Sequence, residues 1–555
     1  MSLTGPDGDL PLLTAAQSRA ADEAAVAAGD SWDGLVARAG AALARVVIDV
    51  LQTTRGGVYG RPVLVAVGKG DNGGDGWVAA AHLRARGAAV SVIAPHGLHV
   101  AMSPHSGRAR AAYLAVGGRA TGALDALDVL SCRIEDQPVI VDCLLGTGVV
   151  GAPRGVIADA IDRLALVAQN PGVAVIACDI ASGVHADSGA VAGRVVRADI
   201  TVTFGAAKRG HALHPGASHA GRVIVAGLGG GWAVESMRAP DRAAVAYATD
   251  DAAARVAPWP VNTDKVARGR VLLVAGSRRY TGAAVLAGAA AVRAGAGLVT
   301  VATAADRGVL LGREAGMMVH QLDDDGTDVG GPAASAAPWL RDAVPASDVV
   351  VVGPGLGHGA GARAVVEAVM DAASPGQTIV LDADALNVFR HDAASLHAAH
   401  EVGCNMVLTP HMRELARLLD VDVASVEKDR VAAARQLADL TGAIVVAKGP
   451  GTLVLASGKA MAVVTSGGPA LGTGGTGDVL AGMLGADLAA AARSGLGGGS
   501  GAHVHDVAMT VHRHGMLGDR AGARSGGRAT AADLLDLLPG LLADLATPTN
   551  LRPTP

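Results

Sequence analysis

Apolar residues gather along this chain into short continuous runs that alternate with longer stretches of mixed polarity. In the first half the runs are PVLVAVG, AVSVIAP, PVIVDCLLG, VAVIACDIA and DITVTFG. Runs that are apolar throughout are typical of parallel strands covered on both faces. The stretches between them, such as GDGWVAAAHLRARG and GVIADAIDRLALVA, are amphipathic and predict helices. The pattern therefore predicts a doubly wound, Rossmann-like α/β sheet.

A second series of apolar runs begins near Arg270 with RVLLVAGS and continues through DVVVVGPG, QTIVLDAD, MVLTPH and AIVVAKG. Between the two series, residues 230–265 lose the strand pattern and contain glycine and proline clusters, which places the domain junction there. A chain of 555 residues is also too long for one ordinary core. We expect two α/β domains, over residues 1–235 and 245–545.

Charge and composition favour small-molecule chemistry. The net charge is only −5 and no Lys/Arg run stands out, so nucleic acid and anionic membranes are not expected partners. The most apolar stretch, from Gly282, is interrupted by Arg293 and predicts a buried helix followed by the strand LVTVAT. Asp7 and Asp9 stand where an export signal has basic residues, so we expect a cytoplasmic protein. The cysteines lack metal-ligand spacing and are expected to pack as reduced thiols: Cys132, Cys143, Cys178 and Cys404.

The stretch VGKGDNGGDG, from Val67, contains the dinucleotide fingerprint G-x-G-x-x-G between a predicted strand and helix. That fingerprint requires a carboxylate about 20 residues later to bond a ribose hydroxyl. Here the second strand ends at Pro95 and His96 instead. Asp71 and Asp75 in the expected turn would also repel a pyrophosphate. Ordinary nicotinamide cofactor binding is therefore disfavoured.

Other polar residues follow strands of the first half. Asp142 ends one strand, and Asp179 and Ser182 follow the next. Because ligands of open parallel sheets bind outside the carboxyl ends of the strands, these residues and Asn72 are expected to converge on one crevice. Oxygen ligands of this type suit a hard cation, although carboxylates equally serve as acid/base groups or helix caps.

The motifs KGDNGGDG, DCLLGTG and DIASG, preceded by LLTAAQSRAADEAAVAAG and LVARAGAALARVV, resemble the NAD(P)HX epimerase family over roughly residues 10–230. The resemblance implies a substrate that is a hydrated nicotinamide cofactor, and a bound potassium ion. It carries substrate contact over to Asp71, Asn72, Gly73, Gly74, Asp75, Gly146, Thr147, Gly148 and Asp179, with Asp179 also catalytic. It carries potassium binding over to Asn72, Asp142 and Ser182.

Two positions depart from the pattern of that family. Asp71 stands where the family commonly has Asn, and Ala181 replaces the proline of its DxPSG motif. Loss of the proline removes a backbone constraint and no ligand, whereas Asp71 adds a negative charge beside the expected cation. Neither departure predicts an inactive domain.

The stretch TSGGPALGTGGTGDVLAGML, from Thr465, predicts a glycine-rich turn that opens a helix. Unpaired amides and the positive helix end then point at one place, which suits a transferring phosphoryl group. Asp478 at the helix start is the candidate base for an attacking hydroxyl. A capping aspartate after a flexible loop would not need so many glycines: Gly472, Gly474, Gly475 and Gly477. The turn resembles the anion hole of the ribokinase-like superfamily.

The motifs VAGSRRYTGAAVLAGAAAVRAGAGLVTVAT, VVGPGLG, LDADALN and TPHMRE resemble ADP- or ATP-dependent NAD(P)HX dehydratases over roughly residues 245–545. The resemblance implies substrate contacts at Ala283, Gly355, His411 and Asp478. It implies nucleotide contacts at Lys448, Gly449, Pro450, Gly451, Thr452 and Gly477. Asp382 and Glu414 are either contributors to a magnesium site or salt-bridged surface residues. The donor, ADP or ATP, stays open.

The histidine-rich stretch HVHDVAMTVHRHG, from His503, has near-helical spacing. It lacks the glutamate that a zinc protease places between two histidines four residues apart. We expect an ordinary helix face there.

Together the resemblances imply a fused repair enzyme for NADHX and NADPHX. Hydration of the reduced nicotinamide ring at C6 gives R and S epimers. The first domain would interconvert them, and the second would dehydrate the S form with a nucleotide. The alternative is a ribokinase-like kinase of a small-molecule hydroxyl, with a non-catalytic ligand-sensing first domain. A homo-oligomer is expected in either case.

Overall fold

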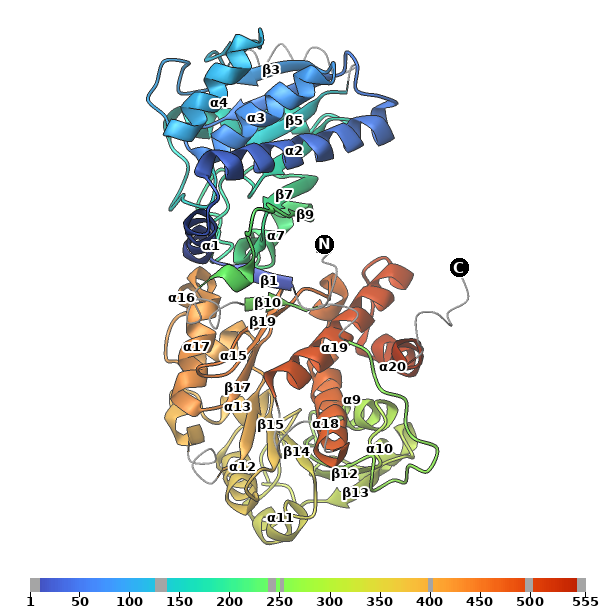
Figure 1. The fold of residues 1–555 in the computed structure, drawn as a ribbon. Helices are drawn as coiled ribbons and strands as arrows, with labels where there is room; N and C mark the ends of the chain where they lie inside the picture. Colours follow the sequence, from blue (N-terminus) through green and yellow to red (C-terminus); the bar gives the residue numbers. More distant parts are fainter. Residues whose placement is uncertain are drawn as a thin grey trace. The chain divides into compact units, whose positions relative to one another are not determined.

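The computed structural model describes residues 10–124, 137–237, 246–249, 254–397, 403–494 and 503–546. The chain divides into two compact units, Met1–Ala248 and Thr249–Pro555. Each unit combines a mainly parallel sheet with flanking helices (Figure 1), which confirms the predicted α/β class. Over the described ranges, no helix has both the length and the apolar character that a membrane span needs. Cys132 lies outside these ranges, and the other cysteines are buried free thiols.

The sheet of the first unit has the order β4-β3-β2-β5-β6-β7-β9, and every pairing between neighbours is parallel. Its strands are β2 (Pro62–Val67), β3 (Ala89–Ile93), β4 (Ala120–Thr121), β5 (Val139–Cys143), β6 (Ala174–Cys178), β7 (Ile200–Phe204) and β9 (Arg222–Ala226). The chain order reverses between β2 and β5. In doubly wound sheets, ligands bind at the carboxyl ends of the strands beside such a switch point.

Helices cover both faces of this sheet. Helices α2, α3 and α4 share one core with it, and α6 shares the core on the opposite face. A short ribbon forms where β1 pairs with β8 in parallel and with β10 in antiparallel fashion. The remaining bounds in this unit are β1 (Leu10–Leu13), α1 (Ala15–Ala27), α2 (Trp32–Arg55), α3 (Asp71–Ala85), α4 (Pro104–Ala115), α6 (Gly155–Ala168), β8 (Ala207–Lys208), α7 (Ala217–Ala220) and β10 (Ala246–Ala248).

The sheet of the second unit runs β13-β12-β11-β14-β15-β16-β17-β18-β19. The pairings are parallel from β13 to β17, and β18 and β19 then add as antiparallel neighbours. Its strands are β11 (Arg270–Val274), β12 (Leu298–Thr303), β13 (Met318–Gln321), β14 (Val349–Val352), β15 (Thr378–Leu381), β16 (Asn405–Leu408), β17 (Ile444–Ala447), β18 (Thr452–Leu455) and β19 (Ala462–Val464). Here the chain order reverses between β11 and β14.

Helices α9, α18 and α19 pack on one face of the second sheet and share a core with it. Figure 1 shows α12 and α17 on the other side of that sheet. The bounds are α9 (Thr281–Arg293), α10 (Arg307–Arg313), α11 (Ala337–Ala343), α12 (Ala360–Ala372), α13 (Asp384–Asn387), α15 (Met412–Leu418), α16 (Val423–Lys428), α17 (Arg430–Thr441), α18 (Thr476–Ser494), α19 (Val504–Ser525) and α20 (Ala531–Ala546). The apolar stretch from Gly282 is α9 and β12, as predicted.

Candidate active sites

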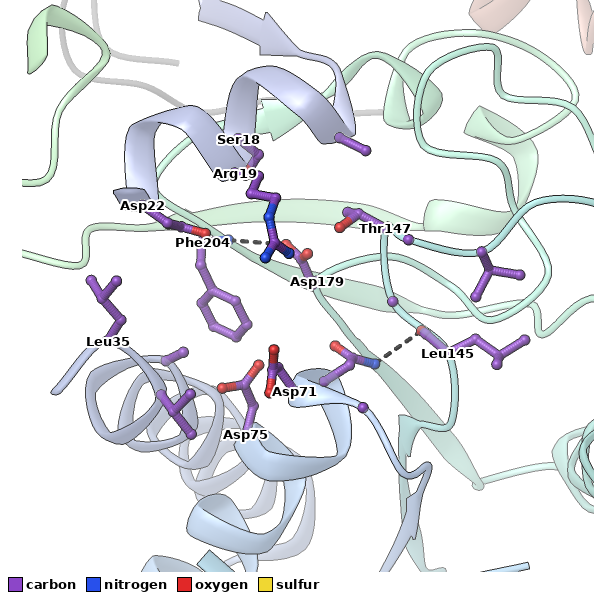
Figure 2. Close-up of a pocket in the computed structure, with 18 of the residues that line it drawn as sticks. Ser18, Arg19, Asp22, Leu35, Asp71, Asp75, Leu145, Thr147, Asp179 and Phe204 are labelled. Atoms are coloured by element: carbon purple, nitrogen blue, oxygen red, sulfur yellow. Dashed lines mark hydrogen bonds between the residues drawn. The ribbon is translucent and has the colours of Figure 1, made fainter. Parts of the chain in front are cut away.

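A cavity of about 610 Å³ opens at the switch point of the first unit. Its walls come from helix α1, the start of α3, the loop after β5 and the ends of β6 and β7. Figure 2 shows Asp71 and Asp75 pointing into the cavity from α3, with Asp179 facing them from the end of β6. The sequence-predicted residues that line it are Asp71, Asn72, Asp75, Gly146, Thr147, Gly148 and Asp179.

The expected turn at Asp71–Asp75 is the first turn of helix α3, so that prediction was wrong. Packing overrides the poor helix propensity of its glycines. A methyl group on Gly73 would lie 2.1 Å from the Gly68 carbonyl oxygen, and one on Gly76 would lie 2.8 Å from Cys143 Sγ. Glycine is therefore needed for α3 to begin this close to the sheet. Asp71 at the helix start accepts a hydrogen bond from Ser103 Oγ.

Asn72, Asp142 and Ser182 meet around the backbone of Leu145. Asn72 Nδ2 donates to the Leu145 carbonyl at 2.9 Å, and Leu145 N donates to Ser182 Oγ at 2.9 Å. Ser182 donates from its amide and its hydroxyl to the buried Asp142 carboxylate, at 2.8 and 2.7 Å. Among the described residues, Asn72 Oδ1 is buried and has no hydrogen-bond partner. An unpartnered buried oxygen and a buried carboxylate that are linked through Leu145 and Ser182 are oxygen donors of the kind that a hard cation binds.

Asp179 forms an ion pair with Lys208, a side chain that is only 2% exposed. Lys208 Nζ also lies 3.0 Å from Thr203 Oγ1, which donates to Asp179 Oδ1 at 2.9 Å. Burial by itself raises the pKa of Asp179, but Lys208 and Thr203 outweigh it and hold that pKa below its ordinary value. Asp179 also has a left-handed backbone (φ 62°), a strained conformation of the kind found at functional sites.

The pKa of Asp75 is shifted in the opposite direction from that of Asp179. Burial raises its pKa well above the ordinary value, and the neighbouring carboxylates Asp179, Asp71 and Asp22 raise it further. The buried thiol of Cys178 donates to Asp75 Oδ2 at 4.0 Å. The cavity therefore holds one carboxyl whose pKa is raised near another whose pKa is lowered. When the surroundings shift two carboxyl pKa values apart, the group with the raised pKa suits the role of acid and the other suits the role of base. Here these are Asp75 and Asp179.

Sequence reasoning missed several residues of this cavity. Lys208 ends the two-residue strand β8, four residues beyond β7, and this strand is too short to be recognised from the sequence pattern. Arg19 and Asp22 come from α1, and Trp232 Nε1 donates to Asp22 Oδ1 at 2.7 Å. That bond joins residues 210 positions apart, and no local pattern in the sequence reveals it.

In the second unit, Ala283 and Gly355 lie together at the switch point between β11 and β14. A methyl group on Gly355, whose φ is 60°, would lie 2.8 Å from Ala283 Cβ. Gly276 N, after β11, donates to the Pro354 carbonyl at 2.8 Å and joins the two loops. The strand-end rule therefore brings these two predicted substrate residues side by side.

Lys448 directly follows strand β17, and Asp382 directly follows strand β15. The two side chains form an ion pair, with Lys448 Nζ 2.7 Å from Asp382 Oδ1. Both side chains are largely buried, so the surface salt-bridge alternative for Asp382 was wrong. Glu414, only 4% exposed, accepts from the His411 amide, while His411 Nδ1 caps the start of α15. Burial raises the pKa of Glu414 to about 7, because the nearby Lys448 only partly offsets it. His411 therefore orients Glu414 and also borders Lys448, whose amide donates to the Pro410 carbonyl.

Asp478 lies in the first turn of α18, directly after the glycine loop. Burial and the neighbouring Asp382 raise its pKa to about 7, although Lys448 lowers it. Lys448 Nζ lies 3.6 Å from the position that a methyl group on Gly477 would occupy. A lysine, the amides at the helix start and a carboxylate with a pKa near neutrality thus surround one place, as phosphoryl transfer requires.

The predicted nucleotide residues 448–451 connect β17 to β18 in a hairpin, and Thr452 is the first residue of β18. Arg430 at the start of α17 donates to the carbonyl groups of Pro450 and Gly451 and so braces this hairpin. Over the described ranges, no group of three or more His, Cys, Asp or Glu side chains is arranged to hold a metal ion. Asp382 and Glu414 therefore fit a magnesium ion only as part of a set that nucleotide phosphates and water complete.

Comparisons with known proteins place a different match on each unit. A family model described as the YjeF-related protein N-terminus matches residues 33–210, and one described as NAD(P)H-hydrate dehydratase matches residues 271–539. The bifunctional NAD(P)H-hydrate repair enzyme of Leishmania major is 36% identical over 84% of this chain and 83% of its own length. The enzyme of that name from Moorella thermoacetica is 34% identical over 90% and 91%. A solved ADP/ATP-dependent NAD(P)H-hydrate dehydratase from Bacillus subtilis, co-crystallised with ATP and Mg²⁺, is 23% identical over 53% of this chain and 96% of that chain, with a TM-score of 0.43.

Proposed function

This chain belongs to the bifunctional NAD(P)H-hydrate repair enzymes, and we propose that its first unit epimerises NAD(P)HX while its second unit dehydrates the S epimer with a nucleotide. The observation that carries the proposal is the presence of an acid/base site in each unit. Asp75 and Asp179 face one cavity in the first, and Asp478 lies beside Lys448 in the second. The corresponding domains are the predicted residues 1–235 and 245–545.

Epimerisation requires the C6–oxygen bond to break and re-form on the other face of the ring. The lone pair of ring nitrogen N1 can expel the C6 hydroxyl once that hydroxyl is protonated. We assign proton donation to Asp75, whose pKa is raised, and stabilisation of the resulting cationic ring to Asp179, whose pKa is lowered. When water adds to the opposite face, Asp179 accepts its proton. Transfer of that proton from Asp179 to Asp75 through solvent restores both carboxyl groups, so no proton is gained or lost overall.

Potassium fits the cluster of Asn72, Asp142 and Ser182, and we propose that these residues hold it. The unpartnered Asn72 Oδ1 and the buried Asp142 carboxylate support this assignment. A cation bound there would supply positive charge beside the cavity wall that carries Asp71 and Asp75. Asn72 and Ser182 also tie the start of α3 to the loop after β5, which fixes two walls of the cavity.

In the second unit the leaving group must be improved, because hydroxide leaves poorly. Asp478 takes the proton of the C6 hydroxyl, whose oxygen attacks the terminal phosphoryl group of the nucleotide. The amides of the glycine loop stabilise the transferring group. The C6 phosphate ester then breaks as N1 supplies its lone pair, phosphate leaves, and loss of a proton from C5 completes the double bond. The products are NAD(P)H, inorganic phosphate and the shortened nucleotide.

We propose that the nucleotide lies along the hairpin 448–452, with Lys448 at its phosphates. Asp382 and Glu414 would orient a magnesium ion that neutralises phosphate charge. The Lys448–Asp382 ion pair and the bonds from Arg430 to the hairpin support this placement. From the sequence we further propose a cytoplasmic homo-oligomer.

Two variants test the division of labour. Asp478→Ala should abolish nucleotide-dependent recovery of 340-nm absorbance from the S hydrate while R/S exchange continues. Asp179→Asn should abolish R/S exchange, while nucleotide-dependent dehydration of the S hydrate continues. Dehydration that survives Asp478→Ala would remove this residue from the mechanism. A stable phosphorylated product in place of NAD(P)H would instead favour the hydroxyl-kinase alternative.

A further inference from the structure

The glycine loop of the second unit rests directly on the backbone of helix α19. A methyl group on Gly515 would lie 2.1 Å from Ser466 Oγ, and one on Gly518 would lie 2.5 Å from Leu471 Cγ. These two glycines lie three residues apart on α19 and therefore face the same side. Any side chain at either position would push the segment that leads into the glycine loop away from the helix.

Polar contacts fix the same interface. Ser466 Oγ lies 2.7 Å from His512 Nδ1 and 2.9 Å from the His512 carbonyl oxygen. The Gly467 amide donates to Asp519 Oδ2 at 2.9 Å. The histidine-rich stretch is thus a helix, as predicted, but His512 (1% exposed) belongs to its buried side.

His514, also on the buried side of α19, reaches the start of α18. Its Nε2 lies 2.9 Å from the carbonyl oxygen of Thr476, and because a carbonyl only accepts, Nε2 carries the proton. Thr476 is the first residue of α18. Its hydroxyl lies 2.8 Å from the Leu471 carbonyl and 3.0 Å from the Thr473 carbonyl. Thr476 therefore connects α19, the glycine loop and α18, the helix that carries Asp478.

We propose that His514 is a positioning residue for phosphoryl transfer, which acts through Thr476 to hold the loop amides and Asp478 where the transferring group lies. The inference rests on the proposed role of the glycine loop as the anion hole. Catalytic amides are effective only when they are held in place before the reaction, because donors that must reorganise lose their advantage.

The electrostatics of His514 suit a fixed donor. Burial lowers its pKa to about 4, and the charge of Lys448 acts in the same direction. The imidazole is therefore neutral near pH 7 and keeps its Nε2 proton for the Thr476 carbonyl. His514 adds no charge to the anion hole and takes no part in proton transfer.

The test compares three variants of the full chain. His514→Ala should lower kcat for dehydration by about 10- to 100-fold, since a small misplacement of catalytic groups is enough to cost that much. The KM for nucleotide should change much less, because the phosphoryl contacts strengthen in the transition state. His514→Gln, which keeps an amide donor at similar reach, should recover most of the loss. His505→Ala, at an exposed position of the same helix, is the matched control.

Three further measurements separate positioning from general damage. Epimer exchange by the first unit should be unchanged in every variant, and equilibrium dialysis should still give one nucleotide bound per chain. Asp519→Ala, at an exposed position, should lower dehydratase kcat without a large loss of stability. A His514→Ala protein with full dehydratase kcat, or one whose loss His514→Gln does not repair, would overturn the inference. If Asp478→Ala also retained dehydration, the proposed function itself would fail.

Discussion

Replacement of Lys208 by Met is the sharpest perturbation of the first unit. Methionine fills the space of the lysine stem but removes the cation that Asp179 faces in a nearly solvent-free setting. Removal of one partner from a buried ion pair costs about 3–5 kcal/mol, because the other charge stays buried and uncompensated. For a unit of this size that corresponds to a fall in Tm of roughly 6–20 °C. The pKa of Asp179 should rise, since burial is then opposed only by weaker partners.

The assay combines calorimetry of the full chain with chromatographic measurement of R/S exchange. Lys208→Met should lower both the Tm of the first unit and the exchange rate, while dehydration of the S epimer below the unfolding temperature should continue. The double variant Lys208→Met/Asp179→Asn should recover much of the stability, because the uncompensated charge is gone, but none of the exchange. Unchanged Tm and exchange in Lys208→Met would refute the reasoning.

The site chemistry supports three further predictions. Burial raises the pKa of Asp478 to about 7. Because a general base must be ionised, dehydratase kcat should fall as the pH drops below about 7. A flat kcat profile from pH 6 to 8 would contradict this role of Asp478. Epimer exchange should lack that acid limb, because the pKa of Asp179 is lowered, and should instead decline at high pH as Asp75 loses its proton. Asn72→Ala should remove any dependence of epimer exchange on KCl at constant ionic strength and leave dehydration unchanged; an unaltered KCl response would exclude Asn72 as a ligand.

Much of the fold could be predicted from the sequence, because parallel strands buried on both faces appear as continuous apolar runs. The ends of those runs also indicated Asp142, Asp179 and Ser182 as site residues, since ligands of doubly wound sheets bind at strand carboxyl ends. The antiparallel strands β18 and β19 were not predicted, because strands of four and three residues are too short to give a clear periodic signal.

Other features depend on contacts between distant segments. The sequence suggested a turn at Asp71–Asp75 because the G-x-G-x-x-G fingerprint places one there, but α3 begins at Asp71 and packs so closely that Gly73 and Gly76 leave no room for a side chain. Asp22 enters the cavity through its bond to Trp232, 210 residues away. The support that α19 gives to the glycine loop was hidden for the same reason, since the histidines that provide it follow the loop by more than 30 residues.

One measurement tests the central claim that a single chain performs both steps. The full chain is incubated with a mixture of R- and S-NADHX, Mg²⁺, KCl and ADP or ATP, while absorbance at 340 nm is followed and the remaining hydrates are chromatographed. The account predicts that recovery continues past the S fraction until both epimers are consumed, with one inorganic phosphate released for each NADH formed. Recovery that stops when the S epimer is exhausted, or a phosphorylated product without NADH, would contradict it.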